Sequence, residues 1–162
     1  MIRTAPAPQS VIVGVFFLLA AAVLAVAPVP LALRSAGTIL FAFLAFGVGG
    51  MPWAYLVALV APPIGLLGGD GEWLVMLPIV LSGNLLATLG LEFAWRWPAL
   101  VVAPGLLIAP HLVVWILSGR DLFRVDLPWD PSGGVWIALH LLFAVAGLLI
   151  AILMERRRSA AR

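Results

Sequence analysis

Five side chains able to bind a small molecule stand inside or beside long stretches of sequence that carry no charge. Arginine recognises carboxylates through paired hydrogen bonds, asparagine offers both a donor and an acceptor, and histidine can bind anions, aromatic rings or metal ions. Ionisable groups are costly inside a bilayer, so each one there raises the question of a function. The candidate ligand-binding residues are Arg34, Asn84, His111, Trp115 and His140.

The two histidines are expected to lie at the same depth in the membrane. His111 precedes Ser118 by seven residues and His140 follows Gly134 by six, in two apolar stretches joined by the polar segment 119–133. At about 1.5 Å of rise per residue, two antiparallel helices would place both imidazoles in the outer half of the bilayer. Such a pair could hold an anionic or aromatic solute. Two histidines with no carboxylate nearby make a weak metal site, so no metal ion is predicted.

Each of these residues also has a structural interpretation, and the sequence leaves both open. Asn84 could hydrogen-bond across a helix interface made of small residues. The histidines could be packed separately or reach toward the membrane surface, and Arg34 could simply anchor a helix end. The functional alternative is a shared pocket that opens outward, in which Arg34 pairs with a solute carboxylate.

No set of residues suited to catalysis is visible, so the protein is not predicted to be an enzyme and no cofactor is expected. The chain has no cysteine, which excludes thiolate nucleophiles and thiolate metal sites. Neither Asp70 nor Glu92 stands beside a histidine in the sequence. The glycines of 65–71 lack the Lys-Ser/Thr pair that a phosphate-binding loop requires.

The elements that must position these residues are membrane-spanning helices. Hydrophobic residues make up 64% of the 162 residues and charged residues only 10%, whereas soluble domains carry about 25% charged residues. Segments of roughly 20 apolar residues cross a bilayer as helices, because the backbone must satisfy its own hydrogen bonds there. The chain is therefore predicted to be a polytopic protein in contact with membrane lipid. Five stretches have no Asp, Glu, Arg or Lys: 11–33, 35–69, 73–91, 97–119 and 131–154.

The number of helices depends on the second stretch. Residues 35–69 are too many for one comfortable helix, and helix-breaking residues cluster at 47–52. Two short helices there make six in all, whereas one tilted helix over 35–61 would make five. We favour an all-α transmembrane bundle of six short helices as a single domain over 1–162, with five helices as the alternative. The expected spans are 11–33, 36–49, 52–67, 73–92, 98–118 and 134–154.

Arginines set the predicted orientation, because basic residues concentrate on the cytoplasmic side of membrane helices. Four of the nine arginines follow the last apolar stretch, so the C-terminus is predicted to be cytoplasmic. Counting back through six helices puts Arg96 inside and Arg34 outside, beside the expected pocket. These arginines gather at the end of a membrane helix rather than on a soluble domain, so nucleic acid is not an expected partner.

Three runs within 47–92 resemble the substrate-binding (S) components of energy-coupling-factor (ECF) transporters: GGMPWAY (49–55), APPIGLLG (61–68) and LPIVLSGNLL (77–86). The resemblance implies six short helices, no enzymatic activity, and capture of a vitamin or other micronutrient at the outer face of a bacterial inner membrane. It also implies partners, namely a transmembrane scaffold subunit and ATPase subunits. In the family an Ala-x-x-x-Ala face on the first helix meets the scaffold, and Ala21 and Ala25 have that spacing here.

Two charged residues at the inner surface are predicted to dock a partner rather than to do chemistry. Glu92 and Arg96 are four residues apart and would pair if one helix carried both. An alternative to transport is a scaffold role. The length and the five-to-six-helix layout also resemble the MreD family of rod-shape-determining membrane proteins, which assemble with cell-wall synthesis partners. That second resemblance rests on size and hydropathy.

Overall fold

The computed structural model describes residues 8–94, 96–118 and 134–160. Within these residues the chain forms six α-helices, one short 3₁₀-helix and no strand, so the predicted all-α fold is confirmed. The elements in chain order are α1 (Pro8–Val26), α2 (Leu31–Gly49), α3 (Met51–Ile64), η1 (Gly65–Gly68), α4 (Gly71–Phe93), α5 (Ala99–Ser118) and α6 (Gly134–Ala160).

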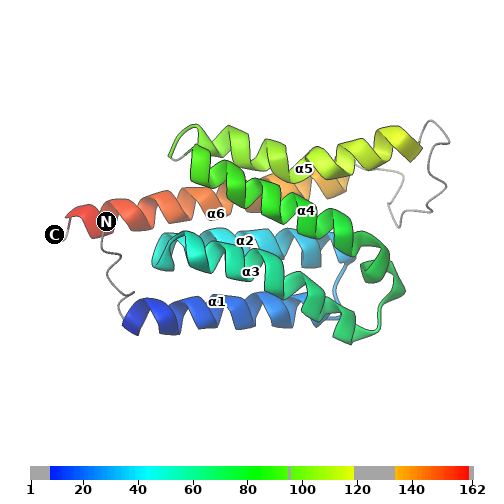
Figure 1. The fold of residues 1–162 in the computed structure, drawn as a ribbon, viewed down its shortest axis with the longest axis horizontal. Helices are drawn as coiled ribbons and strands as arrows, with labels where there is room; N and C mark the ends of the chain where they lie inside the picture. Colours follow the sequence, from blue (N-terminus) through cyan, green and yellow to red (C-terminus); the bar gives the residue numbers. More distant parts are fainter. Residues whose placement is uncertain (1–7, 95, 119–133, 161–162) are drawn as a thin grey trace.

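The helices run alternately in opposite directions along one axis, so consecutive helices are antiparallel (Figure 1). Helix α2 packs against α1, α3, α4 and α6, while α5 packs on α4 and α6. One end of the bundle holds the α1–α2 connection, η1 and the start of α4, and we call it the Asp70 end. The opposite end holds the α4–α5 connection and the last turns of α6, and we call it the Arg96 end.

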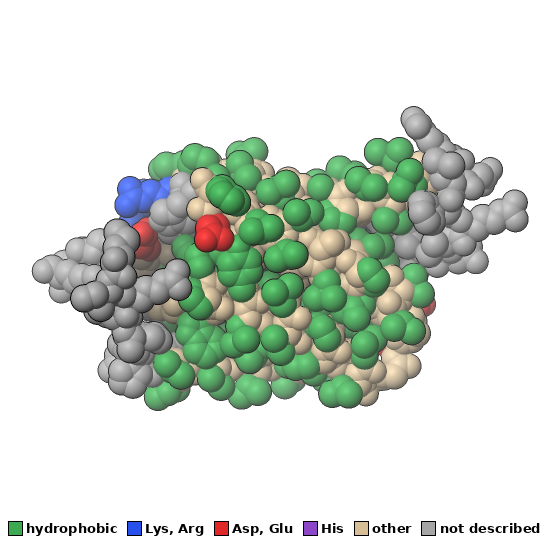
Figure 2. All heavy atoms as spheres, in the orientation of Figure 1, with side chains coloured by type: hydrophobic (Ala, Val, Ile, Leu, Met, Phe, Trp, Pro, Cys, Tyr) green, Lys and Arg blue, Asp and Glu red, His purple; other side chains and the backbone are tan. Residues whose placement is uncertain are grey.

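The lengths and composition of the helices suit a membrane. Five segments are long and apolar enough to cross a bilayer, and α1 adds a shorter apolar stretch, Val11–Val26. Hydrophobic side chains cover most of the visible face, and the charged side chains on it lie toward the two ends (Figure 2). The protein is therefore a multi-pass helical membrane protein. The five segments are Leu31–Gly49, Met51–Gly68, Gly71–Phe93, Ala99–Leu117 and Gly134–Arg157.

The first helix is shorter than expected, and this changes the position of Arg34. The predicted span 11–33 is wrong at its C-terminal end, because the segment 27–30 separates α1 from α2. Pro28 and Pro30 cause the break, since proline has no N–H to donate and disfavours helical geometry in the residue before it. The carbonyl of Pro30 accepts a hydrogen bond from the backbone N–H of Arg34 at 3.1 Å. Arg34 consequently lies in the first turn of α2 rather than between two helices.

The stretch 35–69 contains two helices, as the six-helix prediction requires. The chain turns at Gly50, whose φ of 82° and ψ of −171° suit glycine and are strained for a residue with a Cβ. Pro52 stands in the first turn of α3, where its missing N–H would have no helical partner in any case. The alternative of one long helix over 35–61 is therefore wrong.

The other spans lie close to their predicted positions. Helices α4, α5 and α6 correspond to the predicted 73–92, 98–118 and 134–154, although α6 continues to Ala160. The predicted 52–67 corresponds to α3 together with η1.

Glycines let neighbouring helices approach until backbone meets backbone. A Cβ added at Gly83 of α4 would lie 2.6 Å from the carbonyl oxygen of Leu107 on α5. One added at Gly47 of α2 would lie 2.9 Å from the Cα of Ala151 on α6. In membrane bundles such positions allow close van der Waals packing, which takes the place of the hydrophobic driving force. This packing brings α2, α4, α5 and α6 around a set of interior polar residues.

Candidate functional site

Arg34 is buried at the Asp70 end, with only 5% of its surface exposed. Its Nε donates a hydrogen bond to the carbonyl oxygen of Ala25 at 2.9 Å, and its Nη1 donates to Oδ2 of Asp70 at 2.5 Å. The guanidinium carbon lies over the ring of Trp73, 4.5 Å from the centroid. The second terminal nitrogen, Nη2, is buried and has no hydrogen-bond partner among the described residues.

Asp70 is held in place by the start of α4. Its Oδ1 caps the helix by accepting hydrogen bonds from the N–H groups of Glu72 and Trp73, at 2.9 Å and 3.4 Å. Burial by itself raises the pKa of the Asp70 carboxyl. The hydrogen bond from Arg34, the two backbone N–H groups and the charge of Arg34 outweigh burial, so the pKa lies below its ordinary value of 3.8. Asp70 is therefore ionised at neutral pH and forms an ion pair with Arg34.

The ring of Trp73 is held in position by contacts of its own. Its Nε1 donates a hydrogen bond to the carbonyl oxygen of Pro62 at 2.9 Å, and its side chain is completely buried. Gly65 leaves the space that the ring fills, since a Cβ there would lie 2.3 Å from Nε1 of Trp73. The cation–π contact of Arg34 thus rests on a fixed surface.

Asn84 joins three helices within the bundle. Its Nδ2 donates to Oγ1 of Thr38 on α2 at 2.9 Å and to the carbonyl oxygen of Ala58 on α3 at 3.5 Å. Thr38 in turn donates to the carbonyl oxygen of Ser35 at 2.8 Å. The interhelical hydrogen bond expected from the structural interpretation of Asn84 is therefore present.

His140 uses both of its ring nitrogens, and His111 lies beside it. In the neutral ring Nδ1 carries the proton, because it lies 2.8 Å from the carbonyl oxygen of Trp136, which can only accept. Nε2 then accepts a hydrogen bond from the Ser35 hydroxyl at 2.6 Å. The ring centroid of His111 lies 5.2 Å from that of His140, and the ring of Trp136 stacks on His140 at 4.7 Å. Helices α5 and α6 thus bring the two histidines together.

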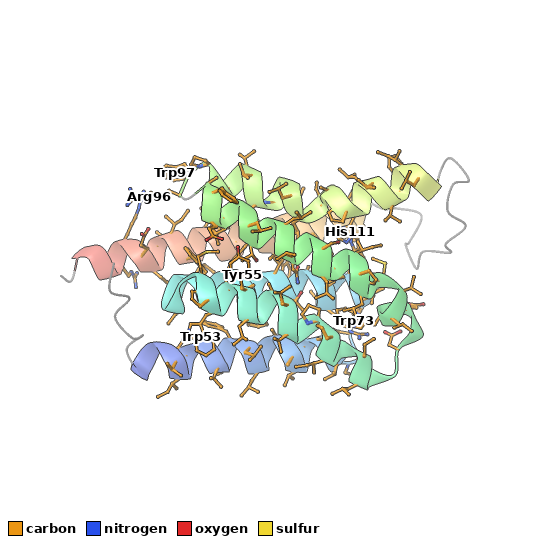
Figure 3. All side chains as sticks on the ribbon, viewed as in Figure 1. Trp53, Tyr55, Trp73, Arg96, Trp97 and His111 are labelled. Carbon is orange, nitrogen blue, oxygen red and sulfur yellow. The ribbon has the colours of Figure 1, made fainter. Side chains whose placement is uncertain are left out.

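Four of the five predicted ligand-binding residues are buried. Helix α2 connects three of them, and His111 joins through its ring contact with His140. Ser35 follows Arg34 on this helix and reaches His140, while Thr38 reaches Asn84. Figure 3 shows His111 and Trp73 in the half of the bundle near the Asp70 end. We call these residues the interior polar cluster. It consists of Arg34, Ser35, Thr38, Asp70, Trp73, Asn84, His111, Trp136 and His140.

Trp115 does not belong to this cluster. It is 64% exposed on the outside of α5, so the described residues do not bring it to the other four, and its role in ligand binding stays a prediction. None of the residues 112–117 is buried, because this end of α5 has few neighbours among the described elements. The polar segment 119–133, which joins α5 to α6, lies outside the described residues.

Sequence reasoning missed several members of the cluster, and two signals could have found some of them. Asp70 stands three residues before the apolar run 73–91, which is a typical helix-capping position. Ser35 and Thr38 follow Arg34 in an otherwise apolar helix and form a short polar stripe with it. No local signal indicates that Trp73 would lie beneath Arg34, because that contact depends on how α2 and α4 pack.

The alanines predicted to meet a scaffold subunit lie inside the bundle. Ala21 and Ala25 are both 0% exposed, so this docking prediction is wrong for the structure as described. Helix α1 uses its small side chains to approach α2 and α3, with which it packs. Ala25 also contributes its carbonyl oxygen to Arg34.

Glu92 and Arg96 are exposed at the Arg96 end, and each has a different partner. Helix α4 ends at Phe93 and Arg96 has a φ of 67°, so no helical turn brings the two together. Glu92 accepts a hydrogen bond from Tyr55 at 2.6 Å, and Nε of Arg96 lies 4.0 Å from Oε2 of Glu155 on α6. Figure 3 shows Arg96 beside Trp97, far from His111 and Trp73. Their predicted role in docking a partner stays a prediction.

The chemistry available to the interior polar cluster is hydrogen bonding and charge. Within the described residues no group of three or more His, Cys, Asp or Glu is placed to hold a metal ion. The arrangement offers one fixed guanidinium with an unused donor, next to a carboxylate that partly reaches the surface. Such a group binds oxyanions.

Comparison of the chain with protein-family models, with curated proteins and with solved structures gave no match in any of the three.

Replacing Asn84 with leucine is expected to lower the free energy of unfolding by about 1 kcal/mol. Leucine has the same number and branching of side-chain heavy atoms but cannot donate to Thr38 or Ala58, and hydrogen bonds between membrane helices contribute about 0.6 kcal/mol on average and up to about 1.7 kcal/mol. Unfolding in mixed micelles followed by circular dichroism measures the change. A double-mutant cycle with Thr38→Val isolates the pair, and a coupling energy of zero would argue against the bond.

Proposed function

We propose that this protein is the membrane-embedded solute-binding subunit of a vitamin or micronutrient uptake transporter. It resides in a bacterial inner membrane with its C-terminus in the cytoplasm, and it captures a small molecule at the Asp70 end from the outer face. A transmembrane scaffold subunit and ATPase subunits would supply the energy for uptake.

The observation that supports this proposal most is the guanidinium of Arg34. An arginine at 5% exposure in a membrane helix is costly to bury, and such groups commonly serve a function. A structural role alone would be expected to satisfy all its donors, yet Nη2 has no partner among the described residues. The unpartnered Nη2 donor therefore supports a role for Arg34 in binding a ligand.

The neighbours of Arg34 add to this support. Aromatic and imidazole rings of Trp136, His111 and His140 gather behind the same end of the bundle. Rings of this kind suit a flat or aromatic solute, because they offer large apolar faces with few rotatable bonds. The resemblance of 49–86 to ECF S components points to the same role.

A scaffold role in a cell-wall complex of the MreD type is the second candidate, and one observation favours it. The amide nitrogen of Asn84 and both ring nitrogens of His140 already have partners within the bundle, as expected if these residues only hold helices together. In this case Arg34 and Asp70 would be a structural ion pair, and the protein would act through its outer surface.

Purification in native-like nanodiscs distinguishes the two candidates. A solute-binding subunit should release a small molecule on denaturation, in about equal molar amount, and should co-purify with ATPase and scaffold subunits. A scaffold should release no such molecule and should bring cell-wall proteins instead. Mass spectrometry identifies both the released small molecules and the co-purified proteins. The absence of any released solute and of transport partners would overturn the proposal.

The orientation of the Asp70 end needs its own control in the same experiment. The chain has no cysteine, so maleimide labels only a cysteine that is introduced by mutation. Gly71 suits this purpose, because a Cβ there meets nothing within 4 Å. Labelling of Gly71→Cys in intact cells by a membrane-impermeant maleimide is expected if this end faces outward.

A further inference from the structure

The donors of Arg34 define what kind of ligand its site accepts. The side chain carries five N–H bonds in a rigid plane. The Nε donor is used by Ala25 and Nη1 by Asp70, whereas Nη2 is buried without a partner among the described residues. Any group that completes this site must therefore accept hydrogen bonds, and an anion does so most favourably in a place of low dielectric constant.

The guanidinium is fixed before a ligand arrives. Trp73 covers one face of it at 4.5 Å, and Pro62 and Gly65 hold Trp73 in place. A preformed plane loses little conformational entropy on binding. The same plane matches the two oxygens of a carboxylate, with which a guanidinium forms two parallel hydrogen bonds.

The charge of Arg34 suits a ligand with a single negative charge. One guanidinium balances one carboxylate, as in its ion pair with Asp70, whereas a second negative charge would need a further cation beside it.

Asp70 occupies the position that such a ligand needs. Its side chain is 31% exposed, compared with 6% for that of Arg34, so a solute from the outside meets Asp70 first. Asp70 lies in a turn with Gly68, Gly69 and Gly71, and Gly69 adopts a left-handed φ of 69°. A Cβ added at Gly69 or Gly71 would meet nothing within 4 Å, so there is open space beside Asp70. Rotation of its side chain can therefore move the carboxylate off Arg34, at the cost of the cap hydrogen bonds from Glu72 and Trp73.

We infer that the solute carries one carboxylate, which takes over the Arg34 guanidinium from Asp70. This inference rests on the proposed function and adds the class of substrate to it. Asp70 is an internal competitor of the solute. Its carboxylate neutralises Arg34 when no solute is bound, and it leaves Arg34 when a carboxylate of the solute binds Nη1 and Nη2.

Asp70→Asn tests the competition, because asparagine caps a helix as well as aspartate but carries no charge. The probes are benzoate and its uncharged counterpart benzamide, titrated against the full chain in nanodiscs with the shift in unfolding temperature as the readout. Benzoate is expected to stabilise the protein saturably and benzamide is not. Asp70→Asn should bind benzoate about 10-fold tighter, and Arg34→Gln should bind it about 10- to 100-fold more weakly, the range for a hydrogen bond to a charged group.

Glu72→Gln is the matched control, since Glu72 is an exposed acid in the same turn. It should leave benzoate affinity unchanged while Asp70→Asn raises it, and both variants keep Arg34, so the comparison holds even if Arg34→Gln does not fold. Equal effects of the two variants, equal binding of benzamide, or no binding of benzoate would overturn the inference. A neutral solute released from the purified protein would also overturn it, yet leave the proposed function intact.

Discussion

Replacing Asp70 with alanine is expected to lower the free energy of unfolding by about 3 kcal/mol. The change leaves the guanidinium of Arg34 buried without its counter-charge, and removing one partner of a buried ion pair costs about 3–5 kcal/mol. The lower end of this range applies because the Asp70 side chain is 31% exposed. Alanine also removes the cap of α4, since Oδ1 accepts from the N–H of Glu72. Unfolding in mixed micelles measures the difference.

Asp70→Asn separates the charge from the cap, and pH gives an independent reading. The pKa of Asp70 is lower in the folded protein than its ordinary value of 3.8, so the folded state favours the ionised form. The stabilisation is present above about pH 4 and is lost as the pH falls through the folded-state pKa. The stability difference between wild type and Asp70→Asn should therefore shrink as the pH falls below 4. A difference that stays constant down to pH 2 would contradict the ion pair.

Gly83→Ala is expected to be the most damaging single methyl addition along α4. The new Cβ would lie 2.6 Å from the carbonyl oxygen of Leu107, and a backbone atom cannot move aside as a flexible side chain can. Helices α4 and α5 must separate, so the free energy of unfolding should fall by about 1–3 kcal/mol, the range for an overpacked core. Unfolding in mixed micelles reads this loss.

Gly105→Ala on α5 provides the matched control for that substitution. A Cβ at Gly105 meets nothing within 4 Å, so this variant should be as stable as the wild type or more stable by up to about 1 kcal/mol, because alanine favours helix. If both variants unfolded alike, the described packing of α4 on α5 would be wrong.

Much of the fold follows from the sequence because the bilayer makes two demands on every span. A span must be long enough to cross the hydrocarbon core, and its backbone must satisfy its own hydrogen bonds as a helix. The break at 47–52 was readable from its glycines and proline, and it produced two helices as predicted. The similar depth of His111 and His140 followed from helix rise alone, and their ring centroids lie 5.2 Å apart. The end of the first helix was misplaced because the two prolines at 28 and 30 outweighed the apolar run that continues past them.

The sequence could not predict which side of each helix faces the interior of the bundle and which side faces lipid. In a soluble helix the side toward water is polar, so periodicity shows which side is buried. A membrane helix is apolar on both sides, since lipid and protein interior alike accept hydrophobic groups. Ala21 and Ala25 therefore gave no sign that they face inward, and Trp115 gave none that it faces outward.

The sequence by itself determined the class of the protein, the approximate spans and the few polar residues that interrupt them. Tertiary structure alone decided which of those residues meet. Arg34 and Asp70 are 36 residues apart and pair only because the α1–α2 and η1–α4 turns come together at one end. The physical reason is that an ion pair between distant segments depends on how helices pack. Glycine contacts near this pair, such as those of Gly37 with Leu24 and of Gly65 with Trp73, contribute to that packing.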